Sequence, residues 1–262
     1  MAHKKTRRSV IAAASIVGAA VAVPASPAAA SYPTCGTLGH YFDGYYNYSP
    51  GPLQVSEGNS AALTVRYGSV CDSDTSADTV IGGLTTNPSA SWEMLNGAAD
   101  SSGHGTGYSQ AGFLRWYGSS DYSFAEYNDF HGQYNRKDDF AHPLSQGSTY
   151  KYQTQYNPGC TCLQNLAAGV QINQTSFNPT GTFATPWQLQ YFGEVHYRES
   201  DIPGNPTVKT NFTHIQREGF GEVWTSALPT LSPGNDNIYR WDESSVNSCS
   251  GYPCFDIWTY YH

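Results

Sequence analysis

The sequence is poor in charged residues and in methionine. Asp, Glu, Lys and Arg make up 13% of its 262 residues, and methionine occurs twice, whereas about a quarter of a typical soluble domain is charged. Apolar residues at helical spacing are almost absent, which excludes a helical bundle. After residue 31 no apolar run is long enough to cross a bilayer as a helix. Aromatic residues are abundant instead, at 14%.

Residues 1–30 have the features of a secretory signal peptide. The cationic start "MAHKKTRRSV" is followed by the short apolar run "IAAASIVGAAVAV" and by the small residues "PASPAAAS". We expect cleavage after Ala30 and export to the extracellular space, by the Sec route or, given Arg7 and Arg8, by the twin-arginine route. Cleavage leaves 232 of the 262 residues.

The expected mature chain is strongly acidic. Loss of the four cationic residues of the signal segment takes the formal charge from −8 to −12. Such a surface excludes nucleic acid and anionic membranes as partners, because both repel an acidic protein. It suits a soluble secreted protein, which we expect to be a monomer.

An even number of cysteines in an exported chain predicts disulfide bonds. All six lie in the mature part: Cys35, Cys71, Cys160, Cys162, Cys249 and Cys254. Cys249 and Cys254 would close a small loop, and Cys35 with Cys71 would tie down the N-terminal segment. Cys160 and Cys162 would form a tight, unusual ring, so the sequence leaves the pairing open. No CxxC pair or histidine cluster is present, and we expect no metal and no cofactor.

Short segments rich in β-forming residues recur along the chain, each bounded by turn residues. They cover residues 106–118, 121–129, 148–157, 166–177, 187–198, 207–218, 238–244 and 254–262. This spacing predicts an all-β fold, a single antiparallel β-sandwich of the jelly-roll or concanavalin-like kind, stapled by disulfides. We expect residues 91–262 to form the sandwich and residues 31–90 to add an N-terminal strand and loops packed on it.

The stretch "WQLQYFGEVHYRESD", residues 187–201, is predicted to be one long strand with alternating faces. One face carries Gln188, Gln190, Phe192, Glu194, His196 and Arg198. The other carries Leu189, Tyr191, Gly193, Val195 and Tyr197 and is typical of a core face. Two earlier strands likewise place Gln110 and Glu126 among aromatic residues, so these strands predict a face that binds an extended polymer.

Short motifs in this region resemble those of the eqolisins, the glutamic peptidases of the G1 type. Trp92 in "SWEMLNG" is followed by "YSQAG" with Gln110 and by "FAEYND" with Glu126, and Glu194 follows Gln110 by 84 residues. The resemblance implies a β-sandwich in which Gln110 and Glu194 are catalytic. It also implies that Trp92 and Glu126 belong to the site, and we place Tyr108 and His196 among the residues that contact substrate.

The chemistry implied by this resemblance needs neither a metal nor a Ser or Cys nucleophile. Glu194 would take a proton from a water as the water attacks the scissile carbonyl, and would return it to the leaving amine. Gln110 would donate a hydrogen bond to the developing oxyanion. The substrate would be an extended polypeptide, and the enzyme would be most active in acid.

Two other readings of the sequence stay open. "GEVHYRESD" loosely resembles the E-x-D-x-x-E strand of laminarinase-type glycoside hydrolases, but His196 replaces the middle Asp. The carboxylate pair would be Glu194 with Glu199 or with Glu126, and Glu194 and Glu199 face opposite ways on a regular strand. The chain could instead be a non-catalytic, lectin-like sandwich that stacks its aromatic residues on a polysaccharide or peptide. Ser-His-Asp catalysis has no support, because the GxSxG motif is missing.

Overall fold

Two antiparallel sheets carry most of the regular structure in the part of the chain that the computed structural model describes. The described residues are 38–48, 58–68, 70–71, 79–81, 84–86, 91–99, 107–116, 119–129, 131–183, 187–197, 200–219, 223–225, 232–235 and 241–259. The predicted signal segment lies outside them. The prediction of an all-β antiparallel sandwich is confirmed.

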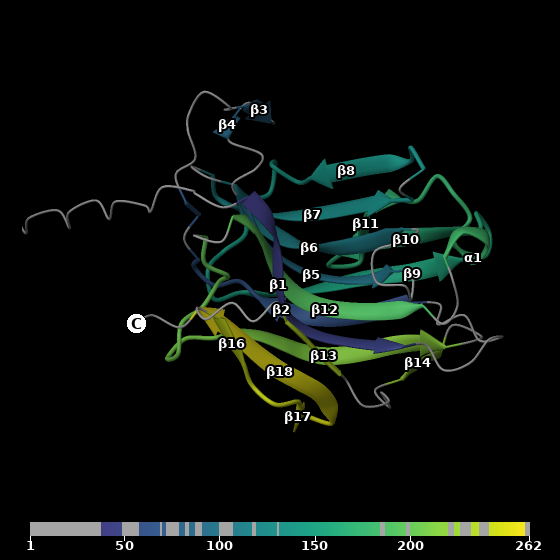
Figure 1. Ribbon diagram of the computed structural model, residues 1–262. Coiled ribbons are helices and arrows are strands. Elements are labelled where there is room, and N and C mark those ends of the chain that lie inside the picture. The colour runs from purple at the N-terminus through teal and green to yellow at the C-terminus, as the bar shows by residue number, and fades with distance from the viewer. Residues whose placement is uncertain are drawn as a thin grey trace, which may run out of the picture. The chain divides into compact units, whose positions relative to one another are not determined.

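The first sheet has seven strands, and five of them lie side by side in the order β8, β7, β6, β5 and β12 (Figure 1). The full order is β15 (Ser232–Asn235), β1 (Leu38–Tyr48), β12 (Gln188–Tyr197), β5 (Ser91–Ala99), β6 (Tyr108–Trp116), β7 (Asp121–Asn128) and β8 (Tyr134–Asp138). The long strand predicted over residues 187–201 is β12, which lies inside this sheet between β1 and β5. It is shorter than predicted, because it ends at Tyr197, and Ser200 and Asp201 are not part of a strand.

The second sheet has nine strands. Along its main path lie β11 (Val170–Gln174), β10 (Cys162–Ala167), β9 (Thr149–Asn157), β2 (Gly58–Thr64), β13 (Thr210–Gly219), β18 (Tyr252–Thr259) and β16 (Trp241–Glu243). β14 (Val223–Thr225) pairs with β13, and β17 (Asn247–Cys249) pairs with β18. Outside both sheets, β3 (Thr79–Ile81) pairs with β4 (Leu84–Thr86). Helix α1 (Pro179–Thr182) is a single turn capped by Asn178, and no described helix has the length and apolarity to cross a membrane.

Two segments differ from the sequence-based expectation. Residues 166–177, predicted as one strand, contain a turn at Ala168 and Gly169, both at positive φ, which separates β10 from β11. Residues 31–90, expected as a strand and loops packed on the sandwich, contribute β1 and β2 to the interior of the two sheets. β2 lacks an alternation of apolar and polar residues because all seven of its residues are buried, so both of its faces are covered.

The core lies between the two sheets and is formed by alternate residues of their strands. Leu189, Tyr191 and Val195 of β12 are fully buried there, on the face that the alternation predicted to be apolar. From the second sheet, Phe212 stacks on Phe255 with ring centroids 4.6 Å apart. Burial of such side chains, worth about 1.5–3 kcal/mol each, is the main stabilising contribution to the sandwich.

Buried polar side chains also join the two sheets. Asn165 on β10 donates to the hydroxyl of Ser109 on β6 at 2.8 Å and to Asn173 on β11 at 2.8 Å. Asn173 in turn donates to the carbonyl of Ala125 on β7 at 3.0 Å. Asn59 on β2 donates to the carbonyls of β5 and β12. These bonds link the second sheet to β5, β6, β7 and β12 of the first sheet. They stabilise this arrangement, because separating the sheets would leave buried amide groups without hydrogen-bond partners.

Two of the predicted disulfides lie within the described residues. Disulfide bonding is confirmed, and of the pairings that the sequence left open, Cys249 is bonded to Cys254 and Cys160 to Cys162. Cys71 is also disulfide-bonded. Cys35 lies outside the described residues, so its pairing with Cys71 stays a prediction.

The carboxyl of Asp121 gives the fold a testable pH dependence. It is 2% exposed and accepts a hydrogen bond from Arg115 at 2.7 Å. Burial raises the pKa of Asp121 above its ordinary value of 3.8, although the Arg115 hydrogen bond and charge and the Gln146 hydrogen bond act in the opposite direction. The folded state therefore holds the proton more tightly than the unfolded state, so this group's contribution to stability falls as the pH rises from near 3.8 through the raised pKa.

We expect Asp121→Asn to weaken this pH dependence. In urea denaturation between pH 3.5 and pH 7, the wild-type free energy of unfolding should fall relative to that of the variant as the pH rises. A constant difference between the two proteins across this range would contradict the assignment.

Candidate functional site

A row of paired residues crosses the outer face of the seven-stranded sheet, the face turned away from the core. Gln110 on β6 pairs with Gly97 on β5 and with Glu126 on β7. Gly97 pairs with Gln190 on β12, and Glu126 pairs with Arg136 on β8. Because paired residues of an antiparallel sheet point to the same face, these five positions form one continuous strip, the Gln110 row.

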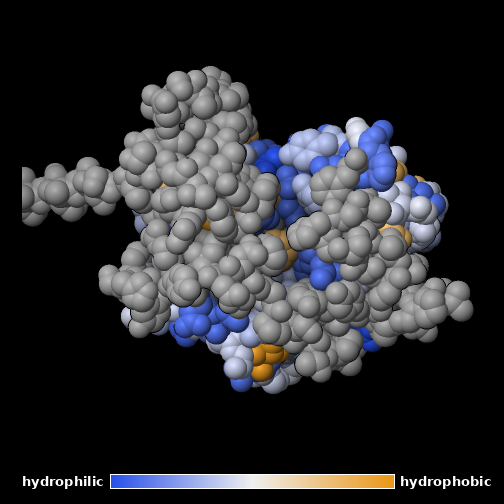
Figure 2. All heavy atoms as spheres, in the orientation of Figure 1, coloured by the Kyte–Doolittle hydropathy of each residue, from blue (hydrophilic) through white to orange (hydrophobic). Residues whose placement is uncertain are grey.

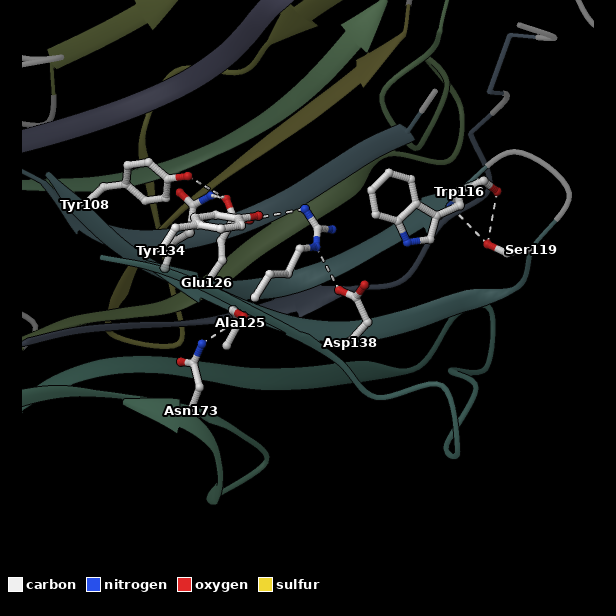
Figure 3. Close-up of polar contacts among 10 residues, drawn as sticks. Tyr108, Trp116, Ser119, Ala125, Glu126, Tyr134, Asp138 and Asn173 are labelled. Carbon is white, nitrogen blue, oxygen red and sulfur yellow. Dashed lines mark hydrogen bonds and ion pairs between the residues drawn. The ribbon is translucent and has the colours of Figure 1, made fainter. Parts of the chain in front are cut away.

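Glu126 is the centre of a hydrogen-bond network in this row (Figure 3). Its Oε1 accepts from Gln110 Nε2 at 2.7 Å and from the Tyr108 hydroxyl at 3.1 Å. Its Oε2 accepts from the Tyr134 hydroxyl at 3.3 Å and from the Arg136 guanidinium at 3.2 Å. Four donors match the acceptor capacity of an ionised carboxylate. The network fixes the Gln110 amide with its nitrogen toward Glu126.

Arg136 is held by charge and by aromatic contact. Its Nε donates to Asp138 at 2.9 Å, so the guanidinium bridges two carboxylates that are 6% and 7% exposed. The guanidinium carbon lies 4.6 Å from the ring centroid of Trp116 and 4.8 Å from that of Phe124. Cation–π contacts of this kind strengthen when desolvated. Arg136 is therefore a fixed cation that holds the Glu126 carboxylate in position.

Glu194 lies on the same outer face but in a different row. It is half-buried, and it pairs with Phe42 of β1 and with Glu93 of β5, which pairs with Leu114 of β6. From Gln190, the β12 member of the Gln110 row, Glu194 is four residues further along the strand, or about 13 Å at strand spacing. It is also two strands from Gln110, or roughly 10 Å. The structure thus does not bring the two predicted catalytic side chains into contact.

The remaining predicted site residues fall into three positions. Tyr108 contacts Glu126 directly, as described above. Trp92 pairs with Val195 and Arg115, and Val195 is buried in the core. The position of Trp92 is therefore on the opposite face of β5 from Gly97, which belongs to the Gln110 row. His196 follows Glu194 by two positions in β12. The register therefore groups Tyr108 with Gln110 and Glu126, and leaves Trp92 at a core-side position.

Three residues of the site region received no role from the sequence. Tyr134 and Arg136 lie on β8, whose five residues "YNRKD" lack the aromatic alternation of the other strands. Their relevance follows only from the pairing of β8 with β7. Gln190 shares a predicted face with Glu194, but its position beside Gly97 follows from the register of β12 on β5.

The described part of the chain holds no group of three or more His, Cys, Asp or Glu side chains that could bind a metal ion. In the orientation of Figure 1, the described surface residues are mostly hydrophilic, and hydrophobic ones occupy small areas (Figure 2). The polar groups of the Gln110 row are amides, carboxylates, tyrosine hydroxyls and one guanidinium, and they lie beside an apolar cluster of Leu114, Trp116 and Phe124. Such groups bind and polarise amide or hydroxyl groups of a ligand.

Comparison with solved structures places the fold with that of the glutamic peptidases. The chain is similar to scytalido-glutamic peptidase with a transition state analog inhibitor, with a TM-score of 0.56 and 12% identity over 85% of this chain and 100% of that chain. A second structure of that enzyme, with a peptide-based transition state analog, gives a TM-score of 0.51 at the same identity and coverage.

A third similar structure is SCP-B, a member of the Eqolisin family in a complex with the tripeptide Ala-Ile-His, with a TM-score of 0.48 and 12% identity. It covers the same shares of the two chains. Neither the family models nor the curated proteins compared with this sequence give a match. At 12% identity the two likenesses above 0.5 show a shared fold.

Proposed function

We propose that the chain is a secreted endopeptidase of the glutamic-peptidase type that hydrolyses extended polypeptides in acid. One observation carries the proposal: a buried carboxylate, Glu126, holds the Gln110 amide on the sheet face that also carries Glu194. The fold is shared with an enzyme whose structure contains a peptide-based transition state analog. These two facts support a substrate-binding role for the face that carries Gln110 and Glu194.

In the proposed reaction, Glu194 is the general base and then the general acid. Its carboxylate removes a proton from a water as the water oxygen bonds to the scissile carbonyl carbon, and it later gives that proton to the leaving nitrogen. The Gln110 nitrogen carries two hydrogens, of which one goes to Glu126. We assign the second hydrogen of the Gln110 nitrogen to a hydrogen bond with a carbonyl oxygen of the substrate.

The separation of the two residues sets a condition on this mechanism. An oxyanion donor must lie about 3 Å from the oxygen on which charge develops, whereas Gln110 and Glu194 lie in different rows. Gln110 serves the scissile carbonyl only if the strands shift when substrate binds. In the register described here it instead contacts the substrate at a distance from the scissile bond. The effect of Gln110→Ala distinguishes these roles, because an oxyanion donor lowers kcat whereas a binding group raises KM.

The test is cleavage of a denatured protein at pH 3 and pH 7 by the mature chain and by Gln110→Ala. We expect cleavage at pH 3 that resists pepstatin and inhibitors of serine and metal peptidases. The variant should lose about 100-fold in kcat/KM if Gln110 stabilises the oxyanion. Absence of cleavage by the folded wild type at both pH values would contradict the proposal, and a screen for glycan binding and glycan cleavage would follow.

A further inference from the structure

Two cationic residues lie side by side on the outer face of the nine-stranded sheet. The register of β2 on β13 pairs Leu63 with Phe212. Continued beyond the ends of both strands, this register sets Arg66 opposite Lys209. Arg66 Nε donates to the carbonyl oxygen of Lys209 at 3.0 Å, which agrees with this alignment. Because the preceding Val65 is buried in the core, alternation places the Arg66 side chain on the outer face.

The Lys209 side chain lies on the same outer face. Its Nζ is 3.7 Å from the ring centroid of Trp258 on β18. Trp258 follows Ile257, which is fully buried in the core, so the tryptophan belongs to the outer side of its strand. The cation–π contact with this ring stabilises the ammonium group. It thereby restricts the Lys209 side chain to the strand next to Arg66.

Neither cation is neutralised within the described part of the chain. Arg66 and Lys209 form no ion pair within 4.0 Å with a described acidic side chain. In the register, the nearest described acidic positions are Asp256, which accepts a hydrogen bond from Asn211, and Asp242, two strand spacings or roughly 10 Å from Lys209. Like charges opposite one another on neighbouring strands are destabilising. An anion from outside the chain would relieve this repulsion.

The space in front of the Arg66 guanidinium is open to solvent. A Cβ added to Gly147, which is exposed, would lie 3.7 Å from Arg66 Nη1 and would meet no other atom within 4 Å beyond its chain neighbours. Tyr67 and Val208, the chain neighbours of the two cations, are 51% and 46% exposed. Arg66 and Lys209 are themselves half-buried. A ligand can therefore reach both charged groups without displacing a side chain.

The donors that remain define the kind of ligand. Arg66 uses Nε for the Lys209 carbonyl, which leaves the N–H groups of both Nη atoms. A guanidinium binds two oxygens of one anionic group at once, and an ammonium adds a compact positive charge with three further donors. Two positive charges match a doubly charged oxyanion better than a single carboxylate, because only the former neutralises both.

We propose that Arg66 and Lys209 form a binding site for a doubly charged oxyanion of the sulfate or phosphate kind. The site lies on the outer face of the second sheet, whereas the Gln110 row and Glu194 lie on the outer face of the first. It is therefore separate from the proposed peptidase site and does not depend on the proposed function. The same chemistry serves a free anion and an anionic group carried by a polymer, such as a sulfated polysaccharide.

The experiment is an NMR titration of the ¹⁵N-labelled mature chain at pH 7, with inorganic sulfate as the probe and sodium chloride to keep the ionic strength constant. The amide shifts of residues 64–68 and 207–210 report on the site. Arg66→Met and Lys209→Met each remove one cation and keep an unbranched side chain. Lys151→Met is the matched control, because Lys151 is an exposed cation on β9 of the same sheet and pairs with Ala62, about 13 Å along β2 from Arg66.

We expect saturable shifts in the wild type at millimolar sulfate. Arg66→Met and Lys209→Met should each raise Kd at least about tenfold, because each removes hydrogen bonds from a charged donor. Lys151→Met should change Kd by less than about twofold, because a charge beyond the Debye length is largely screened. Shifts that do not saturate, or a rise in Kd as large in Lys151→Met as in Arg66→Met, would overturn the site.

Dextran sulfate distinguishes the two sources of the anion. Tighter binding per sulfate group than free sulfate, with the advantage lost in Arg66→Met, supports the site and identifies a polymer as the carrier. Equal affinity per sulfate group, again reduced in Arg66→Met, supports the site with a free anion as its ligand.

Discussion

Glu194→Gln is expected to abolish peptide cleavage, with a loss of about 1,000-fold or more in kcat/KM. General acid–base catalysis contributes roughly 100- to 10,000-fold to such reactions, and a neutral amide cannot accept a proton from the attacking water. The replacement preserves the shape and most hydrogen-bonding geometry of the side chain. Because Glu194 is half-buried, the variant should fold. Steady-state kinetics on a denatured protein at pH 3 measures the effect, and circular dichroism checks the fold.

Glu243→Gln on β16 is the matched control for this variant, since Glu243 is also a half-buried strand glutamate but lies in the second sheet. It should retain full activity. A Glu194→Gln variant that keeps more than a tenth of the wild-type activity would remove Glu194 from the proposed catalytic role. Glu93→Gln is a useful companion, because Glu93 is the register partner of Glu194. Equal losses in both variants would indicate that the two carboxyls act together.

Arg136→Met is expected to produce the largest loss of stability among single changes in the site, about 3 kcal/mol. Removal of one partner from a buried ion pair leaves an uncompensated charge, and Arg136 serves two carboxylates, Glu126 and Asp138. Methionine keeps much of the contact with Trp116 and Phe124 but not the charge. The melting temperature should fall by roughly 6–12 °C for a domain of this size. Urea denaturation at pH 7 measures the change.

Lys137→Met is the control for this prediction, because Lys137 is exposed and adjacent to Arg136 on β8. Its effect should stay within about 0.5 kcal/mol. Adding Glu126→Gln to Arg136→Met should restore part of the lost stability, since it removes one of the two carboxylates left without their cation. Equal destabilisation by Arg136→Met and Lys137→Met would show that the charge network contributes little.

The sequence by itself determined the class of fold and the face on which most strand residues lie. Alternation along residues 187–198 correctly separated Leu189, Tyr191 and Val195, which are buried in the core, from the face of Gln190 and Glu194. This works because side chains of a strand alternate whatever its neighbours are. The even number of cysteines likewise predicted disulfides, although their pairing, such as that of Cys249 with Cys254, came only from the structure.

Only the tertiary structure decided which of these residues lie beside one another. Gln110 and Gln190 lie in one row on either side of Gly97, and Glu194 is four residues from Gln190 along β12. Glu126 also reaches Tyr134 and Arg136 only because β8 pairs with β7, and the sequence does not predict this pairing. Periodicity fixes the face within one strand, whereas the register between strands distant in sequence depends on how all strands pack together. That packing placed Gln190, and not Glu194, in the same row as Gln110.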